Sequence, residues 1–329
     1  MKVLFVVVLP LALFACSSRE KPLQEMRGET MGTRFQLKWS GGEIDEDTIR
    51  KGLQDILARY EAELSNWNHF SWVTQFNRQQ DTDWRDAPPT VIHVLEKSQR
   101  VYRQTQGAFD VTVSPLVELW GFGSSKVSGI PSDVQIAEVM THVGMDQLEI
   151  DSASGHVRKL NPMLTINCSA IAKGHAVDDV ADWLQAQGVK HYMIEIGGEL
   201  RVMGHPPGKE AWTIGILKPG NDLSVIQEKV VLQSGAMATS GDYLNFTQIG
   251  GEFYPHIINP STGRPVKHRL RSVTIVGKRC ATSDALATAC LVMGTSRALD
   301  LIESLQGYEA YLIEQHEDGS LRVIQSSHF

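Results

Sequence analysis

The chain has 329 residues, of which 42% are hydrophobic and 21% are charged. This length allows a large buried core, and the composition is ordinary for a soluble globular protein. The 31 basic and 38 acidic residues give a formal net charge of −7. No run of lysine or arginine interrupts this mildly acidic balance, so a nucleic-acid partner has no electrostatic basis.

Residues 1–15 have the layout of a secretory signal peptide. Lys2 precedes an apolar run of about a dozen residues, which is too short for a membrane span of about 20 residues. The run ends in Leu13-Phe14-Ala15-Cys16, which resembles a bacterial lipobox, so cleavage would leave an acylated Cys16 and a lipid-anchored tether over residues 16–27. Ser17 resembles the outer-membrane sorting pattern. The alternative is a plain secretory signal with an incidental cysteine.

Helical spacing of apolar residues dominates the first part of the chain. The clearest case has its apolar positions at 49, 53, 56, 57, 60 and 64. Pro88-Pro89 opens the next helix and Gly107 ends it, because proline suits a helix start and glycine a helix end. The predicted elements are a strand over 34–39 and helices over 45–65, 88–107, 132–144 and 173–187.

Beyond residue 190 the pattern changes to short strands separated by Gly, Pro and Asn turns. Clustered strands with helices between them, rather than strict alternation, indicate an α+β fold with largely antiparallel sheet. No linker divides residues 28–329, so we expect one domain there. The predicted elements are strands over 191–196, 211–217, 229–233, 243–248, 271–276 and 308–314 and a helix over 283–293.

Three cysteines remain once Cys16 is set aside, namely Cys168, Cys280 and Cys290. An odd number without close spacing is not a disulfide framework, even in an oxidising compartment. We expect them to be small buried hydrophobic residues.

Asp284 and Thr288 are four residues apart in a predicted helix, so they share one face. A carboxylate and a hydroxyl that point the same way are hard oxygen ligands, which suit Mg²⁺ better than zinc. The alternative is that Asp284 caps the helix start and that Thr288 bonds back to the preceding turn.

Residues 166–175 predict an apolar strand, a small-residue turn and a helix. Such a junction presents backbone N–H groups to a phosphate, although an ordinary turn explains the pattern equally well. His256 precedes an Asn-Pro-Ser-Thr-Gly turn and is either a general base or a structural histidine. Three further segments, 107–110, 197–198 and 238–241, are typical of loops.

Taken in order, these segments resemble one family, the FAD:protein FMN transferases or ApbE-type lipoproteins. The match spans nearly the whole mature chain. The segments that carry it are Thr30-Met31-Gly32-Thr33, Gly107-Ala108-Phe109-Asp110, the stretch 114–123, Lys173-Gly174, Ile196-Gly197-Gly198, Thr239-Ser240-Gly241, the stretch 256–265, and Asp284 with Thr288.

The resemblance implies an α+β fold of two related halves around a nucleotide cleft. It implies that FAD, the substrate, binds near Met31 and the Ala108-Phe109-Asp110 loop, with Lys173 and Ile258 also lining the site. It implies an Mg²⁺ held by the Ala170 carbonyl, the Asp284 carboxylate and the Thr288 hydroxyl. The acceptors it implies are exported domains of membrane electron-transfer complexes of the sodium-translocating quinone reductase type, on the periplasmic side of a bacterial membrane.

Three positions depart from the commoner pattern of the family. Trp67 stands where many members have tyrosine, and it can still stack on a flavin or adenine ring. Asn167 stands where aspartate is frequent in the family, and Asn259 stands where some members carry aspartate.

The chemistry implied is transfer of the FMN half of FAD to a Thr or Ser hydroxyl of another protein, with release of AMP. His256 is the candidate base, and Asp284 is the candidate metal-binding catalytic residue. Two alternatives stay open: an FAD pyrophosphatase that gives FMN and AMP, and a non-catalytic flavin-binding lipoprotein.

Overall fold

The computed structural model describes residues 21–123, 129–220, 222, 224–242, 246–249 and 252–329. The predicted signal peptide, Cys16 and Ser17 lie outside the described residues, and so do residues 243–245 of one predicted strand. Within the described part of the chain, no helix is both long enough and apolar enough to cross a membrane.

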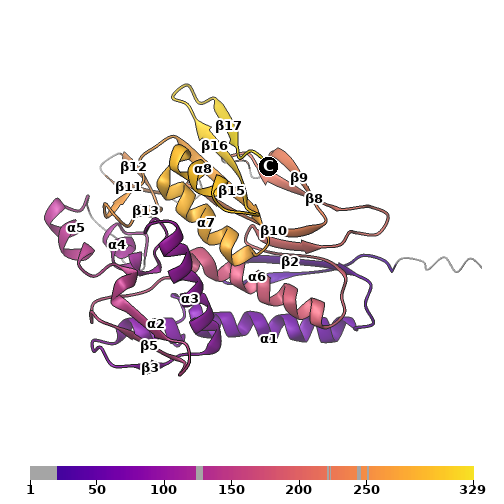
Figure 1. Ribbon diagram of the computed structural model, residues 1–329, viewed down its shortest axis with the longest axis horizontal. Helices are drawn as coiled ribbons and strands as arrows, with labels where there is room; N and C mark the ends of the chain where they lie inside the picture. The colour runs from indigo at the N-terminus through magenta and orange to yellow at the C-terminus, as the bar shows by residue number, and fades with distance from the viewer. Residues whose placement is uncertain (1–20, 124–128, 221, 223, 243–245, 250–251) are drawn as a thin grey trace, which may run out of the picture.

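An eight-stranded sheet in which every pair of neighbours is antiparallel forms the centre of the molecule (Figure 1). Its order shows that strands distant in sequence lie side by side, with β10 between β7 and β15. In order across the sheet the strands are β1 Gln24–Thr30, β2 Thr33–Ser40, β6 His191–Ile196, β7 Glu199–Met203, β10 Ser234–Gly241, β15 Leu270–Gly277, β16 Glu309–Gln315 and β17 Leu321–Gln325.

Four small antiparallel sheets surround the large one. They are β3 Arg85–Asp86 with β5 His156–Lys159 and β4 Leu148–Asp151; β8 Trp212–Leu217 with β9 Ile226–Leu232; β11 Phe246–Ile249 with β12 Glu252–Pro255; and β13 Ile258–Asn259 with β14 Arg264–Pro265. The helices are α1 Glu46–Leu64, α2 Trp72–Arg78, α3 Pro89–Gln104, α4 Ser114–Leu119, α5 Asp133–Met140, α6 Ser169–Ala186, α7 Cys280–Met293 and α8 Thr295–Glu303. Short 3₁₀ turns occupy Val111–Val113 and Met145–Gln147. Helices combined with antiparallel sheets confirm the predicted α+β class.

The two faces of the large sheet are buried by different partners, because successive side chains of a strand point to opposite faces. Ile194 lies in the main core with residues of α1, α3, α6 and α7. Its neighbour Met193 lies in a second cluster, together with Trp212 of β8. Helix α7 is enclosed: 11 of its 14 residues are buried, which explains why apolar residues occur on all its sides.

The predicted helices are present, and their ends follow from local capping. The six apolar positions predicted for the first helix are the buried residues of α1, and the Asp45 side chain caps it by accepting the N–H of Thr48. Ser132 and Gln135 form a reciprocal capping box at the start of α5. The cysteine prediction is also confirmed, since Cys168, Cys280 and Cys290 are free and buried.

Two predictions of local structure are wrong. Residues 164–168 do not form a strand before α6, because side-chain amides take its place: the N–H of Ile166 donates to Asn77, and its carbonyl accepts from Asn66 and Asn77. Residues 238–241 are not a loop but the end of β10. Alanine and glycine have low strand propensity, which the pairing of these residues with β15 overrides.

Two helices begin earlier than the sequence predicted. Helix α6 begins at Ser169 rather than 173, and α7 begins at Cys280 rather than 283.

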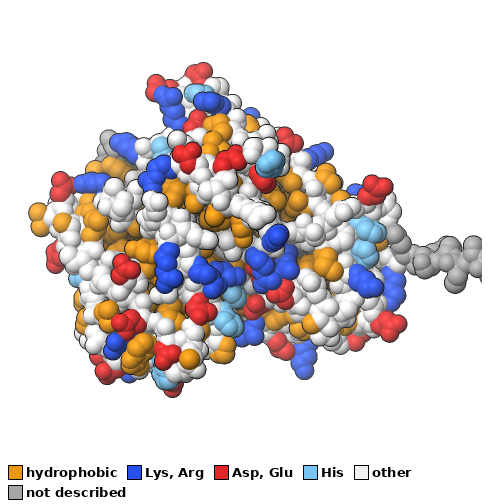
Figure 2. Space-filling view, viewed as in Figure 1, with side chains coloured by type: hydrophobic (Ala, Val, Ile, Leu, Met, Phe, Trp, Pro, Cys, Tyr) orange, Lys and Arg blue, Asp and Glu red, His pale blue; other side chains and the backbone are white. Residues whose placement is uncertain are grey.

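Lysine and arginine side chains gather on the face shown in Figure 2, over α3, α6 and the start of α7. Arg279, which immediately precedes α7, is one of the partly exposed basic residues.

Candidate functional site

Helices α6 and α7 touch at Gly174. A Cβ atom added there would lie 2.6 Å from the carbonyl oxygen of Cys280 and 2.8 Å from the Cβ of Asp284, which is closer than such atoms approach. The Gly174 N–H also donates to Asp284 Oδ2 at 3.0 Å. Only glycine permits this approach, and the predicted metal ligand Asp284 is thereby held against the first turns of α6.

Asp284 and Thr288 lie one turn apart on α7, as their spacing predicts. Asp284 is only 3% exposed. The Thr288 hydroxyl is half-buried and lies 3.0 Å from Ser240 Oγ on β10. The alternative of an N-terminal cap is wrong, because α7 begins at Cys280 and Asp284 lies in its second turn.

Ala170 lies in the first turn of α6. In a regular helix its carbonyl oxygen would accept the N–H of Gly174. Asp284 Oδ2 competes for that N–H. This competition weakens the helical hydrogen bond to the Ala170 carbonyl oxygen. A weaker bond leaves that oxygen more available to a cation, which is the role predicted for it.

Lys173 brings a positive charge to the same place. Its ammonium lies 3.1 Å from Glu199 Oε1 on β7. Burial alone would lower the pKa of Lys173, but the Glu199 and Asp284 carboxylates raise it above its ordinary value, so the ammonium stays charged. Burial raises the pKa of both carboxyls, and the Lys173 charge offsets part of that rise. A bound cation would likewise offset the cost of burying the two negatively charged carboxylates.

A cavity of about 640 Å³ adjoins this cluster at the turn between β1 and β2. Met31 and Gly32 both have positive φ, 49° and 70°, which a two-residue hairpin turn requires. The Met31 N–H donates to Glu61 of α1 and so fixes the turn. The cavity is lined by Glu29, Thr30, Met31, Gly32, Thr33, Arg34, Glu61, Glu195 and Gly197. A Cβ on Gly197 would lie 3.4 Å from Lys173 Cδ, so cavity and lysine are neighbours.

The Ala108-Phe109-Asp110 loop is largely buried, so it shapes the site rather than exposing its side chains. Asp110 Oδ1 accepts the N–H of Thr112 at 2.7 Å and its hydroxyl at 2.6 Å. Burial raises the pKa of Asp110 to about 6, although these hydrogen bonds act against the rise. The next residue, Val111, accepts the N–H of Asn167 at 2.7 Å, which ties the loop to the start of α6.

Trp67 lies on the loop between α1 and α2, and 73% of it is exposed. The side chain of its neighbour Asn66 donates to the carbonyl of Ile166 at 2.9 Å. This bond anchors the loop that carries the exposed indole to Ile166, four residues before Ala170.

The contacts of His256 and Ile258 involve residues other than those of this cluster. The His256 ring packs edge-on against Phe122, with 6.5 Å between ring centres. The Ile258 side chain is buried in a small cluster with Leu116, Trp120 and Ile136. Any contact of Ile258 with a nucleotide would therefore use its backbone. The roles of both residues stay predictions.

The donor set fits a magnesium ion. The Asp284 carboxylate, the Thr288 hydroxyl and the Ala170 carbonyl are all hard oxygen donors. Among the described residues, no three His, Cys, Asp or Glu side chains gather closely enough to hold a metal. A cation here would therefore rely on hydroxyl, carbonyl and substrate phosphate oxygens, the pattern typical of Mg²⁺ at phosphate sites.

Two residues of the cluster were not predicted, Glu199 and Ser240. Glu199 follows Gly197-Gly198 directly, and its buried Oε2 has no hydrogen-bond partner among the residues that the structure describes. Ser240 lies inside the Thr239-Ser240-Gly241 segment. Each residue lies in or beside a motif that carries the family resemblance, so the sequence contained a local indication of its importance. Their place in the cluster depends on the order of the sheet, which brings β7 and β10 under α6 and α7.

Comparisons with known proteins identify the family of this chain. The model of the ApbE family matches residues 31–312. The FAD:protein FMN transferase of Vibrio cholerae is 36% identical over 321 residues, which cover 96% of this chain and 95% of that protein. The one of Haemophilus influenzae is 33% identical, with 95% and 92% covered.

Solved structures give the same result at the level of the fold. The flavin transferase ApbE from Vibrio cholerae superposes with a TM-score of 0.84 at 34% identity, covering 94% of this chain and 98% of that one. The apo flavinyl transferase ApbE of Pseudomonas stutzeri also reaches 0.84, at 30% identity and with 94% and 96% covered. The chain belongs to the ApbE family.

Proposed function

We propose that this protein is a magnesium-dependent FAD:protein FMN transferase. One observation carries the proposal: the Asp284 carboxylate and the Lys173 ammonium lie where α6 and α7 touch, beside the cavity at the β1–β2 turn. The two other predicted donors are one helical turn away, Thr288 further along α7 and Ala170 one turn before Gly174 on α6. The relatives that bear the name FAD:protein FMN transferase support the choice of substrate and reaction. A cavity of about 640 Å³ is of the size that binds a nucleotide-like ligand.

Different residues bind different parts of FAD. Met31 and the cavity around it take one end of the dinucleotide, and the indole of Trp67 stacks on one of its rings. Lys173 offers a charge to the diphosphate, beside the first turn of α6. The buried Ala108-Phe109-Asp110 loop fixes the position of the segment that leads into that turn.

The reaction is a displacement at phosphorus. The acceptor hydroxyl oxygen forms a bond to the phosphorus of the FMN half, and the bond from that phosphorus to the bridging oxygen breaks. AMP leaves with the bonding electrons, and the proton of the hydroxyl passes to a base, for which His256 is the candidate. A magnesium ion held by Ala170, Asp284 and Thr288 would neutralise charge on the diphosphate. Holding the hydroxyl in line supplies much of the rate.

The cellular setting forms part of the proposal. An acylated Cys16 would anchor the enzyme on the periplasmic side of a bacterial membrane, and Ser17 favours the outer membrane. The acceptors would be exported domains of membrane electron-transfer complexes, such as those of the sodium-translocating quinone reductase type.

The test is mass spectrometry of such an acceptor domain after incubation with FAD, MgCl₂ and the protein. We expect the acceptor to gain one FMN, and we expect a chelator to prevent it. Asp284→Ala should abolish the modification, whereas Asp300→Ala, which removes an exposed carboxylate from α8, should not. Free FMN without modified acceptor would indicate a pyrophosphatase, and intact FAD would indicate a binding protein. Either result would contradict the proposal.

A further inference from the structure

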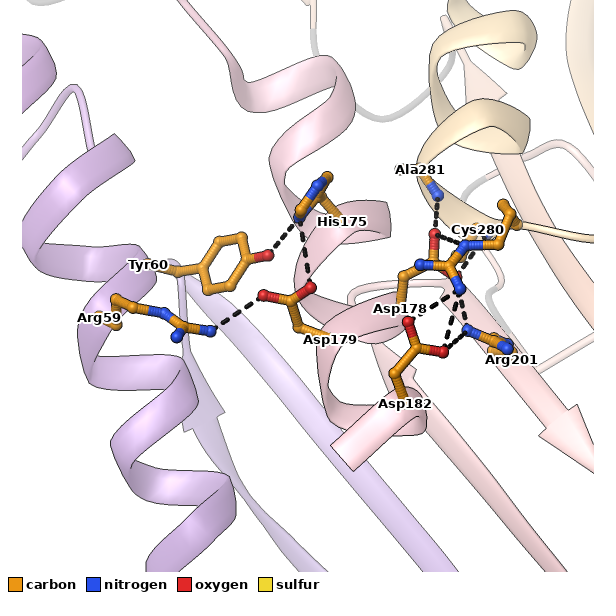
Figure 3. Close-up of polar contacts among 10 residues, drawn as sticks. Arg59, Tyr60, His175, Asp178, Asp179, Asp182, Arg201, Cys280 and Ala281 are labelled. Carbon is orange, nitrogen blue, oxygen red and sulfur yellow. Dashed lines mark hydrogen bonds and ion pairs between the residues drawn. The ribbon is translucent and has the colours of Figure 1, made fainter. Parts of the chain in front are cut away.

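The acidic side chains in the middle of α6 point to two different helices (Figure 3). Asp179 points to α1, where Oδ2 pairs with Arg59 at 2.9 Å, and His175 contacts Tyr60 on the same side. Asp178 points to the start of α7. Two adjacent carboxylates of one helix therefore hold two different neighbours.

Asp178 caps α7 from another helix. Its Oδ1 accepts the N–H of Cys280 at 3.0 Å, and its Oδ2 accepts the N–H of Ala281 at 3.1 Å. These are N–H groups that a helix start leaves without an internal partner. Arg279, at the cap position of α7, makes no side-chain hydrogen bond to these N–H groups. The negative charge of Asp178 at this end also interacts favourably with the positive end of the α7 helix dipole.

The same carboxylate reaches a third element. Arg201 of β7 lies 3.2 Å from Asp178, and Arg279 lies 3.3 Å from it. The Asp178 side chain is fully buried, so its charge depends on these two guanidinium groups and the two N–H groups. Arg201 is two residues from Glu199, so both side chains lie on one face of β7. Asp178 thus joins the three elements that carry Lys173, Asp284 and Glu199.

The contacts between α6 and α7 form two rungs. Gly174 bonds to Asp284, and one turn further along α6, Asp178 bonds to Cys280, one turn back along α7. The two helices therefore run in opposite directions, and the Asp178 rung fixes how far one is shifted along the other. A shift would carry Asp284 away from Gly174 and Lys173.

We propose that Asp178 is a positioning residue of the magnesium site: it sets the register of α7 on α6 and so places Asp284 against Gly174, one helical turn from Ala170. The inference rests on the proposed function. It assigns Asp178 no contact with FAD or the metal, because the carboxylate is fully occupied by its four partners.

The experiment compares Asp178→Asn with Asp179→Asn. Both variants remove one carboxylate from α6, but only the first loosens α7. Calorimetric titration of MgCl₂ into the FAD-bound protein should show about tenfold weaker binding or more for Asp178→Asn, the range typical of residues that orient metal ligands. Asp179→Asn should bind MgCl₂ as the wild type does. FMN transfer by Asp178→Asn should recover at high MgCl₂.

A merely structural role gives a different pattern, in which Asp178→Asn melts earlier but its folded fraction binds MgCl₂ with wild-type affinity. That result would overturn the inference, as would equal weakening in both variants. If the wild type itself neither binds MgCl₂ nor transfers FMN, the proposed function fails instead.

Should Asp178→Asn not fold, Cys280→Pro provides the second test. It removes one N–H that Asp178 accepts, at a first-turn position where proline is tolerated. Arg279 before it is already extended, with φ −127° and ψ 128°, which a following proline requires. We expect weaker MgCl₂ binding here as well, and wild-type affinity would overturn the inference.

Discussion

Replacing Gly174 by alanine tests the contact between α6 and α7 directly. The added Cβ would lie 2.6 Å from the Cys280 carbonyl oxygen, so the helices have to separate by about 0.8 Å before ordinary contact distance is reached. Overpacking of this kind costs about 1–3 kcal/mol, and the better helix propensity of alanine returns about 1 kcal/mol. The expected net loss of stability is therefore about 0–2 kcal/mol.

The effect on activity should exceed the effect on stability. Separation stretches the 3.0 Å bond from the Gly174 N–H to Asp284 beyond hydrogen-bonding range. A displacement near 1 Å in a catalytic site costs on the order of 100-fold in rate. We expect kcat/KM for FMN transfer to fall by about that factor, while thermal melting shifts by only a few degrees, about 2–4 °C for each kcal/mol.

Gly215→Ala is the matched control. Gly215 lies in β8, and the nearest atoms to a Cβ there would be in the side chain of Ile226, at 3.3 Å. Its melting temperature and activity should stay close to those of the wild type. Wild-type kcat/KM in Gly174→Ala would refute the reasoning, because it would mean that the placement of Asp284 does not depend on this contact.

Two further predictions concern Asp110 and Trp67. Because burial raises the pKa of Asp110 from 3.8 to about 6, the folded protein keeps a proton that the unfolded chain has lost, and stability falls as pH rises through this window. Asp110→Asn should remove up to about 3 kcal/mol of that fall in pH-dependent unfolding, whereas Asp86→Asn, at a side chain that is 96% exposed, should not; an unchanged profile would contradict the burial argument. Trp67→Ala should raise KM for FAD about tenfold with little change in melting temperature, and Trp67→Tyr should restore it. Equal KM values in all three proteins would exclude stacking.

The sequence was informative wherever local periodicity governs structure. The six apolar positions of α1 and the pairing of Asp284 with Thr288 on one helix face follow from 3.6-residue spacing, and both are present. What spacing could not supply is long-range pairing. Strand β10 looks like a loop because its residues are small, and it becomes a strand only between β7 and β15.

The same limit applies to the site. Glu199 and Ser240 join the cluster because sheet order brings their strands beneath α6 and α7, which no local pattern encodes. Asp178 looks like an ordinary polar residue of a helix, and the N–H groups that it caps lie more than 100 residues away, at the start of α7. The burial of Ile258 likewise depends on α4 and α5, which pack around it.

The most direct measurement is anomalous diffraction from crystals of the protein grown with FAD and soaked in MnCl₂, because Mn²⁺ replaces Mg²⁺ at oxygen sites and scatters strongly. We expect one metal peak within coordination distance of the Asp284 carboxylate, the Thr288 hydroxyl and the Ala170 carbonyl, next to the diphosphate. FAD bound with no metal peak there, or a peak held by other residues, would contradict the account.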